Sequence, residues 1–315
     1  MGLFSNNKKP CPVCGEATPR LFPTKVEGTP ICKECARKIF LPEGMLNSMT
    51  MGGFMEYMNY YKENQTLRDI FESTYSFRLG ASNIDILLDT SNRLFRLSVN
   101  ESALVMEASC LKSFRIWEGD KLLFESQGNA LKSYESNVPD KVSGMVAVIE
   151  QFKSRYDEYR FRQQIERRRE VEAERRGEEY QREYISEPTF TGYEPFDCFR
   201  VELMMEHPYW SEISGEVDGP KFDRTYPSIG SYISDYHNEA EQMHEFAMNL
   251  MQFMSPGATE VRDVNGAAVF ETRQALAGTT GNNAIEEIKQ YKGLLDAGII
   301  TEEEFAAKKR QLLGL

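Results

Sequence analysis

Four of the six cysteines in this chain stand in two closely spaced pairs near the N-terminus, and they are the residues best suited to chemistry. Cys11 and Cys14 form the first Cys-x2-Cys pair, and Cys32 and Cys35 form the second. Two residues between paired ligands allow one tight turn to present both sulfurs to a single ion, and four thiolates close a tetrahedral zinc site. The spacing therefore predicts one structural Zn²⁺ bound by these four side chains.

Two other interpretations of the pairs are less well supported. A thioredoxin-like redox pair requires a surrounding βαβ unit, which the flanking sequence does not indicate. A catalytic zinc keeps an open coordination position, whereas four cysteines fill the shell. The segment is poor in apolar residues, so metal binding would supply most of its folding free energy. Cys110 and Cys198 are isolated in strand-like sequence, and we interpret them as buried small hydrophobic residues.

Composition excludes several classes of protein. The 315 residues carry a net charge of −12, which argues against a protein that binds nucleic acid by covering its phosphates. No stretch reaches the roughly 18 apolar residues of a membrane span, and the N-terminus lacks the features of a secretory signal. We therefore expect a cytoplasmic protein with reduced thiols. The sequence contains no Walker A, nucleophile-elbow or His-Glu-x-x-His motif, so we expect no catalytic residues and no enzymatic activity.

Beyond the cysteine pairs, the sequence predicts a β-rich region. Residues 83–89 and 93–99 are typical of a hairpin, and a turn at 118–120 leads into a strand at 121–126. A further strand is predicted at 198–205, followed by an amphipathic helix at 237–254. We expect the strands at 84–126 and 198–205 to lie in one sheet covered by that helix. The apolar face of the helix consists of Met243, Phe246, Ala247, Leu250, Phe253 and Met254.

A charged helical insertion separates the two halves of this region. It begins as an amphipathic helix with Ile149, Phe152, Tyr156 and Tyr159 on one face. Beyond Gln163 the apolar face gives way to Glu and Arg at i,i+4 spacing, which predicts a solvated helix that projects outward. A partner-binding or self-associating coil is the alternative, although no heptad repeat indicates one.

The C-terminus reads as a helical hairpin after a Gly-rich linker. Thr301 and Glu304 form a capping box that starts the second helix. Two short helices cannot bury all their apolar side chains between themselves, so we expect an interaction surface here. Its residues are Ile285, Ile288, Leu294, Leu295, Ile299, Ile300, Phe305, Leu312 and Leu313.

This hairpin resembles the SHOCT family, whose pattern is followed by LLDAGIITEEEFAAKKRQLL at 294–313. The resemblance implies an oligomerisation or interaction module without catalysis, of the kind found on bacterial and phage proteins. The N-terminal segment resembles a four-cysteine zinc ribbon of unassigned function. The β-rich region with its helix is similar to a pleckstrin-homology-like domain, which implies a curved antiparallel sheet capped by one helix. In relatives a Gly-rich apolar stretch often follows the turn at 118–120, and here the charged insertion takes that place.

The expected fold class is therefore α+β. The expected boundaries are a zinc ribbon at 1–40, a helical linker at 41–77, the first half of the pleckstrin-homology-like domain at 78–144, the insertion at 145–186, the second half with its capping helix at 187–255, a flexible linker at 256–282 and the hairpin at 283–315.

The expected function is that of a non-catalytic interaction or scaffold protein that forms homo-oligomers or binds a protein partner through its hairpin. A nucleic-acid-associated regulator that uses the ribbon is one alternative, although the charge argues against it. A peripheral membrane factor is the other, and nothing in the sequence indicates it directly. We expect no small-molecule substrate.

Overall fold

The computed structural model describes residues 9–80, 84–264 and 267–271, together with Thr301, Phe305, Ala306 and Lys308. The chain has mixed helix and sheet content, with three separate sheets among the described residues. It divides into two compact units. The first takes its residues from 1–133, 199–218 and 245–270, and the second takes them from 134–198, 219–244 and 271–315.

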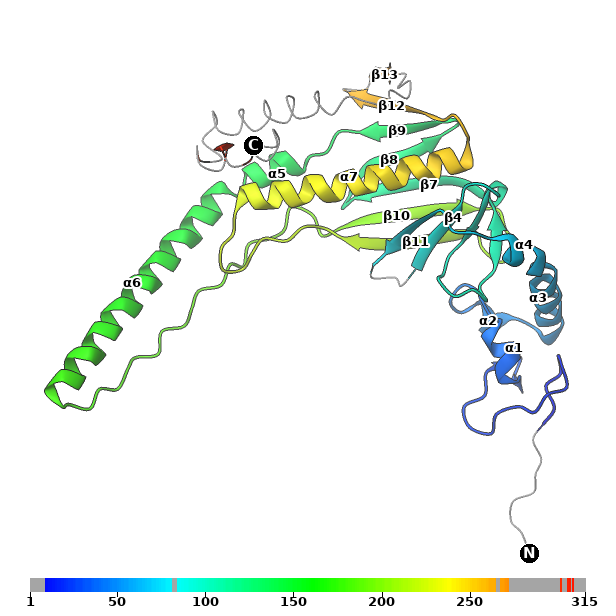
Figure 1. Cartoon of the computed structure of the whole chain (residues 1–315), viewed down its shortest axis with the longest axis horizontal. Helices are drawn as coiled ribbons and strands as arrows, with labels where there is room; N and C mark the ends of the chain where they lie inside the picture. The colour runs from blue at the N-terminus through cyan, green and yellow to red at the C-terminus, as the bar shows by residue number, and fades with distance from the viewer. Residues whose placement is uncertain are drawn as a thin grey trace, which may run out of the picture. The chain divides into compact units, whose positions relative to one another are not determined.

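A small hairpin and four short helices open the first unit (Figure 1). The side chain of Thr50 caps the third helix by accepting a 3.1 Å hydrogen bond from the backbone N–H of Gly53. Phe54, Tyr57 and Tyr61 follow at helical spacing and are all buried, so one face of this helix lies in a core. The elements are β1 (Lys25–Val26), β2 (Thr29–Pro30), α1 (Lys33–Arg37), α2 (Met45–Ser48), α3 (Met51–Glu63) and α4 (Gln65–Ile70).

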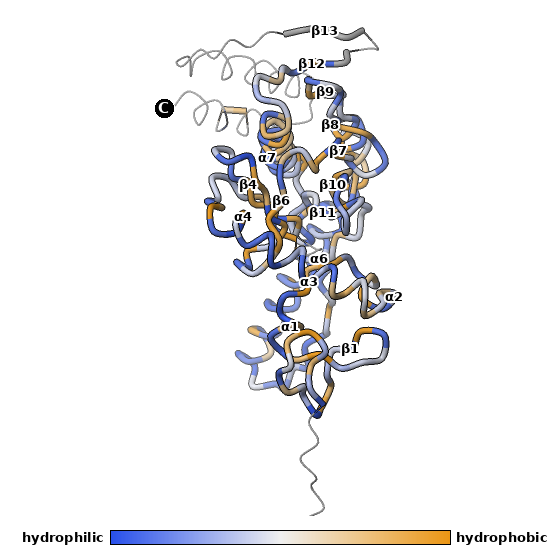
Figure 2. The backbone as a smooth tube through the Cα atoms, turned by 90° about the vertical axis from the view of Figure 1, so that its right-hand side faces the viewer, coloured by the Kyte–Doolittle hydropathy of each residue, from blue (hydrophilic) through white to orange (hydrophobic). Residues whose placement is uncertain are grey.

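A four-stranded antiparallel sheet follows, in the order β3-β4-β5-β6. Its central hairpin pairs Leu88 with Phe95, which confirms the hairpin predicted at 83–99. The strands are β3 (Tyr75–Leu79), β4 (Ile84–Asp89), β5 (Leu94–Arg96) and β6 (Val105–Glu107). Figure 2 shows hydrophobic residues in this region, as expected for strands that enclose a core.

The larger sheet has seven strands in the order β11-β10-β7-β8-β9-β12-β13. The turn predicted at 118–120 is confirmed, because Glu118 pairs with Lys121 and Gly119 takes a left-handed φ of 59° that suits glycine. The strands are β7 (Leu111–Glu118), β8 (Lys121–Gln127), β9 (Ala130–Tyr134), β10 (Cys198–Met205), β11 (Glu212–Asp218), β12 (Thr259–Val264) and β13 (Ala267–Glu271).

The strands at 84–126 and 198–205 do not share one sheet, contrary to the sequence expectation. Strand β10 pairs antiparallel with β7, with Val201 opposite Ile116, as predicted for these two strands. Strands β4 and β5 belong instead to the four-stranded sheet. The physical reason is a short 3₁₀ turn, η1 (Ala108–Cys110), which interrupts the extended chain between β6 and β7.

The predicted apolar helix is confirmed as α7 (Ile229–Met254). The ring of Phe246 stacks on that of Phe77 at 4.1 Å, and Phe253 meets Phe95 edge to face at 6.0 Å. The predicted face is buried except at Met254, which is half-buried. The C-terminal part of α7 therefore packs on strands β3 and β5.

The second unit contains α5 (Val138–Ser143) and the long helix α6 (Val146–Arg176). Ile149 and Phe152 are buried, which confirms the predicted amphipathic start of α6. The chain then returns in extended form, and Phe190 meets the ring of Phe152 at 5.4 Å. Phe222 in turn contacts Phe190 at 5.6 Å. Aromatic packing of this kind fastens the base of α6 to the returning chain.

The segment predicted as a flexible linker at 256–282 contains β12, which lies next to β9 in the large sheet, and β13, which lies next to β12. The sequence of β12 is Thr-Glu-Val-Arg-Asp-Val, in which Thr and Val are β-branched residues that favour strands. Residues 272–282 lie outside the described residues. Among the described residues, no helix has both the length and the apolar content needed to cross a bilayer.

Candidate metal centre

The first Cys-x2-Cys pair lies in a tight loop. The backbone N–H of Gly15 donates to the carbonyl of Cys11 at 2.8 Å, and the N–H of Cys11 donates to the carbonyl of Glu16 at 2.7 Å. Gly15 has a φ of 80°, a conformation in which a Cβ atom would be strained. The loop therefore presents the Cys11 and Cys14 side chains from one turn.

The second pair follows the hairpin of β1 and β2. Its two-residue turn places both Glu27 and Gly28 at positive φ, as a type I′ turn requires. Cys32 is the N-cap of α1, and its sulfur accepts a 3.4 Å hydrogen bond from the backbone N–H of Cys35. Backbone N–H groups at the start of a helix favour negative charge, so this position suits a thiolate.

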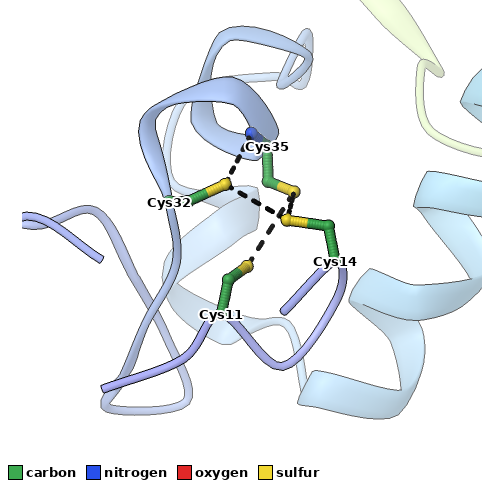
Figure 3. Close-up of side chains that lie close together, drawn as sticks. All are labelled: Cys11, Cys14, Cys32 and Cys35. Atoms are coloured by element: carbon green, nitrogen blue, oxygen red, sulfur yellow. Dashed lines mark hydrogen bonds between the residues drawn. The ribbon is translucent and has the colours of Figure 1, made fainter. Parts of the chain in front are cut away.

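The four sulfur atoms converge on one point, as Figure 3 shows. All lie within 4.8 Å of one another. The Sγ–Sγ distances are 3.9 Å for Cys11 and Cys35, 3.4 Å for Cys14 and Cys32, and 3.6 Å for Cys14 and Cys35. A tetrahedral ion with metal–sulfur bonds of about 2.3 Å requires sulfur atoms about 3.8 Å apart. The geometry therefore fits a tetrathiolate metal site.

The thiols are free, and their ionisation is unequal. The distances are far longer than the roughly 2.05 Å of a disulfide bond. Burial opposes ionisation of Cys11, but hydrogen bonds from backbone N–H groups, that of Cys32 foremost, outweigh it and lower the pKa of its thiol to about 7. Burial and the neighbouring thiols raise the pKa of Cys35 above its ordinary value. Four thiolates at this separation repel one another, and a bound cation is what stabilises them together.

The predicted metal ligands are thus brought together, and three of them are buried. They share a small core with Val26 and Ile31, which are fully buried, and with the aromatic face of α3. Four sulfurs complete a tetrahedral shell and leave no coordination position for a substrate. Within the described part of the chain, Cys110 and Cys198 lie outside this group.

Tyr57 of α3 connects the metal centre to the rest of the unit, and sequence reasoning did not single it out. Its hydroxyl donates to the carbonyl of Lys38 at 2.7 Å and accepts from the backbone N–H of Phe40 at 2.8 Å. The side chain is fully buried, and burial raises its pKa. The only sequence signal was the Tyr and Met spacing in 51–61, which indicates a helix face without naming its partner.

The predicted interaction surface of the hairpin lies almost entirely outside the described residues. Phe305 is half-buried, and its backbone N–H donates to the carbonyl of Thr301 at 3.0 Å, an i,i+4 bond of helical type. Lys308 donates from Nζ to the Ser234 hydroxyl on α7 at 3.4 Å. The residues not described are Ile285, Ile288, Leu294, Leu295, Ile299, Ile300, Leu312 and Leu313.

Comparison with sequence families identifies the C-terminal module. Residues 286–313 match the family described as SHOCT, short C-terminal domain. The match covers the hairpin that the sequence pattern indicated, and the chain therefore carries a SHOCT domain at its C-terminus. Comparison with curated proteins and with solved structures gave no match.

Proposed function

We propose that this chain is a non-catalytic interaction or scaffold protein of the cytoplasm that self-associates, or binds a protein partner, through its SHOCT domain. The observation that carries the proposal is the family match at residues 286–313. The sequence there predicts a hairpin with more apolar side chains than two short helices can bury, and uncovered apolar surface is typical of interaction sites. A chain built from a closed metal site, a sheet body and such a hairpin suits protein–protein assembly rather than catalysis.

The metal in this proposal is a structural zinc. Four thiolates at tetrahedral separations suit Zn²⁺, and a catalytic zinc would need an open position. The ion would replace the apolar core that this small segment lacks. Its role is to hold the two loops and α1 against α3, and no substrate contacts it.

The sheet body would be the pleckstrin-homology-like part. Its antiparallel strands and the packing of α7 on β3 and β5 support this assignment. The long helix α6 interrupts it, so the surface near the end of β9 differs from that of an uninterrupted domain. In the proposal this body carries the zinc-binding segment and the SHOCT domain.

Truncation after Gly281 tests the proposal, because it removes the SHOCT domain and retains β12 and β13. Light scattering on full-length and truncated protein across a concentration series should give a larger mass for the full chain alone. The double variant Leu294→Asp, Leu295→Asp should behave like the truncation, since charge in an apolar interface is unfavourable. An unchanged mass, with no loss of a protein that co-purifies with the full chain, would refute the proposal.

A further inference from the structure

A cleft of about 410 Å³ lies in the first unit, away from the cysteines. Helix α4 and the segment that follows it form one wall, and strand β5 and the turn at 101–102 form the other. Its volume falls in the range of about 300–1,000 Å³ that is usual for small-molecule sites. Two arginines line it, Arg68 from α4 and Arg96 from β5.

Arg96 is buried, and one of its N–H donors has no hydrogen-bond partner in the described part of the chain. Its side chain is only 8% exposed, and its Nε atom lacks a partner among the described residues. The guanidinium lies over the ring of Phe71 at 4.8 Å, a contact that does not use its N–H donors. An arginine remains charged, so an unpaired buried guanidinium destabilises the fold unless another group compensates.

Two other buried polar side chains of the same unit are satisfied. The carboxylate of Asp89 accepts hydrogen bonds from the backbone N–H groups of Glu72 and Asn92, both at 2.9 Å. Asn64 exchanges two hydrogen bonds with the backbone of Val105, at 2.7 and 3.0 Å. Arg96 differs from these two residues in that its Nε atom has no partner within the described ranges, and it lines the cleft.

The walls of the cleft are fixed before any ligand binds. The Asn64 bonds to Val105 fasten the junction of α3 and α4 to strand β6, which pairs with β5 at Arg96. The Tyr61 hydroxyl donates to the carbonyl of Ser102 at 2.9 Å and ties the helix to the opposite rim. Arg68 stacks over Tyr61 at 3.9 Å, so its position is constrained as well. A rigid site loses little entropy on binding.

We propose that this cleft binds a small polar molecule through an oxyanion group, a carboxylate or a phosphate, which pairs with Arg96 and Arg68. A guanidinium offers parallel N–H donors that match two oxygens of such a group. Burial lowers the pKa of Arg96, and the nearby carboxylate of Glu101 offsets this effect only in part, so an oxyanion beside the guanidinium would stabilise its charge further.

The rim of the cleft restricts the ligand further. Asp69 and Glu101 line it and are both exposed, so they offer hydrogen-bond acceptors to water or to a ligand. They repel a second anionic group and favour hydroxyl or amino donors beside the first. The preferred class is therefore a molecule with one oxyanion and neighbouring donors, for which glycerol 3-phosphate is a suitable probe.

Titration calorimetry on the full-length protein at constant ionic strength tests the proposal, with inorganic phosphate, succinate and glycerol 3-phosphate as probes. At least one probe should bind saturably, and Arg96→Met should weaken it by about tenfold or more. The comparison of succinate with the two phosphates identifies which oxyanion is preferred. The control Arg115→Met removes the same charge from β7, where the side chain is 55% exposed, and should leave binding unchanged.

Thermal unfolding without ligand distinguishes a binding role from a structural one. If Arg96 serves a ligand, Arg96→Met should unfold at the same temperature as the wild type or higher, because it removes an unpaired buried charge. Ser102→Trp at the exposed rim should block the cleft without disturbing the core, and it serves if Arg96→Met fails to fold. The proposal is overturned if no probe binds the wild type below about 10 mM, or if Arg96→Met or Ser102→Trp binds as the wild type does.

Discussion

At the scale of single residues, the metal centre depends on residue type and on local backbone together. The two Cys-x2-Cys pairs predicted from the sequence the four cysteines that the structure brings together, because few other arrangements use four cysteines at this spacing. The structure adds that Cys32 also caps α1, so one side chain caps the helix and belongs to the group of four cysteines that could hold an ion. Gly15 and Gly28, both at positive φ, shape the two loops that carry the pairs.

Replacing one ligand tests the metal site. Cys14→Ser should reduce bound zinc from about one ion per chain toward zero after dialysis, because three thiolates and a hydroxyl bind zinc less tightly. Elemental analysis measures the metal, and thermal unfolding should show a lower midpoint. Cys110→Ser is the matched control, since Cys110 lies outside the cluster and should keep the full metal content. Equal zinc in both variants would contradict the assignment.

His207 predicts a pH dependence of stability. Burial lowers its pKa to about 4. The backbone N–H of Tyr209 donates to its Nδ1 atom at 3.2 Å, so the ring proton is placed on Nε2, which faces the Tyr60 hydroxyl at 2.8 Å. Protonation of Nδ1 would place its new N–H opposite the backbone N–H of Tyr209, so two donors would face each other without an acceptor. The unfolded chain binds this proton more readily, so stability is complete above pH 6.5 or so and is lost as the pH falls toward 4.

The measurement is chemical unfolding at several pH values. We expect a loss of up to about 2 kcal/mol between pH 7 and pH 4 that is specific to this residue, after allowance for its partial exposure. His207→Gln should flatten the profile over this range. His237→Gln, on the exposed surface of α7, should leave it unchanged. A profile that is identical in the wild type and His207→Gln would show that another group controls it.

At the scale of elements, the apolar periodicity and turn residues of the sequence predicted several individual strands and helices. Strand β10, helix α7 and the hairpin of β4 and β5 were all indicated by apolar spacing or turn residues. The division into two sheets was not predictable, because it depends on η1, a three-residue turn without Gly or Pro. Strands β12 and β13 were missed for a related reason. Their Gly- and Ala-containing surroundings resemble a linker, and only their places in the large sheet, β12 beside β9 and β13 beside β12, make them strands.

The charged helix α6 holds a buried carboxylate that the sequence did not indicate. Glu166 is 3% exposed, although it stands among arginines and glutamates. It accepts hydrogen bonds from the Tyr180 hydroxyl at 2.5 Å, from Arg169 at 2.8 Å and from the backbone N–H of Glu183 at 3.3 Å. The bond from Tyr180, above all, lowers the pKa of Glu166 against the effect of burial. The returning chain is therefore fastened to the outer part of α6.

Glu166→Gln tests this fastening. A neutral amide accepts weaker hydrogen bonds than a carboxylate, so residues 178–187 should separate from α6 more often. Trypsin should then cleave after Arg182 several times faster, while the midpoint of global unfolding changes little because few core side chains are involved. Glu158→Gln is the matched control, since Glu158 pairs with Arg162 on an exposed face. Equal cleavage rates in the two variants would count against a fastened segment.

At the scale of the whole molecule, the cysteine segment shares a hydrophobic core with other elements of its compact unit. The buried cluster around Cys11, Cys32 and Cys35 includes Phe54, Tyr57 and Tyr61 of α3 and extends to Leu104 beside strand β6. An independent segment would be disturbed alone when its metal ligands are replaced. A shared core predicts a wider response, because cooperative units follow contiguous packing rather than sequence boundaries.

Removal of the metal from the full-length protein tests this coupling. With a chelator, amide hydrogen exchange should become fast in residues 25–40, where the metal supplies most of the folding free energy. It should also accelerate in α3, because Tyr57 loses its partners at Lys38 and Phe40. A smaller increase is expected at 101–105, which α3 reaches through the Tyr61 bond to Ser102. Helix α6 lies in the other compact unit and should keep its exchange rate, and added zinc should restore the rest. If α3 stays protected while residues 25–40 exchange freely, the metal stabilises only the loops that bind it. Loss of the metal would then not destabilise α3 through the shared core.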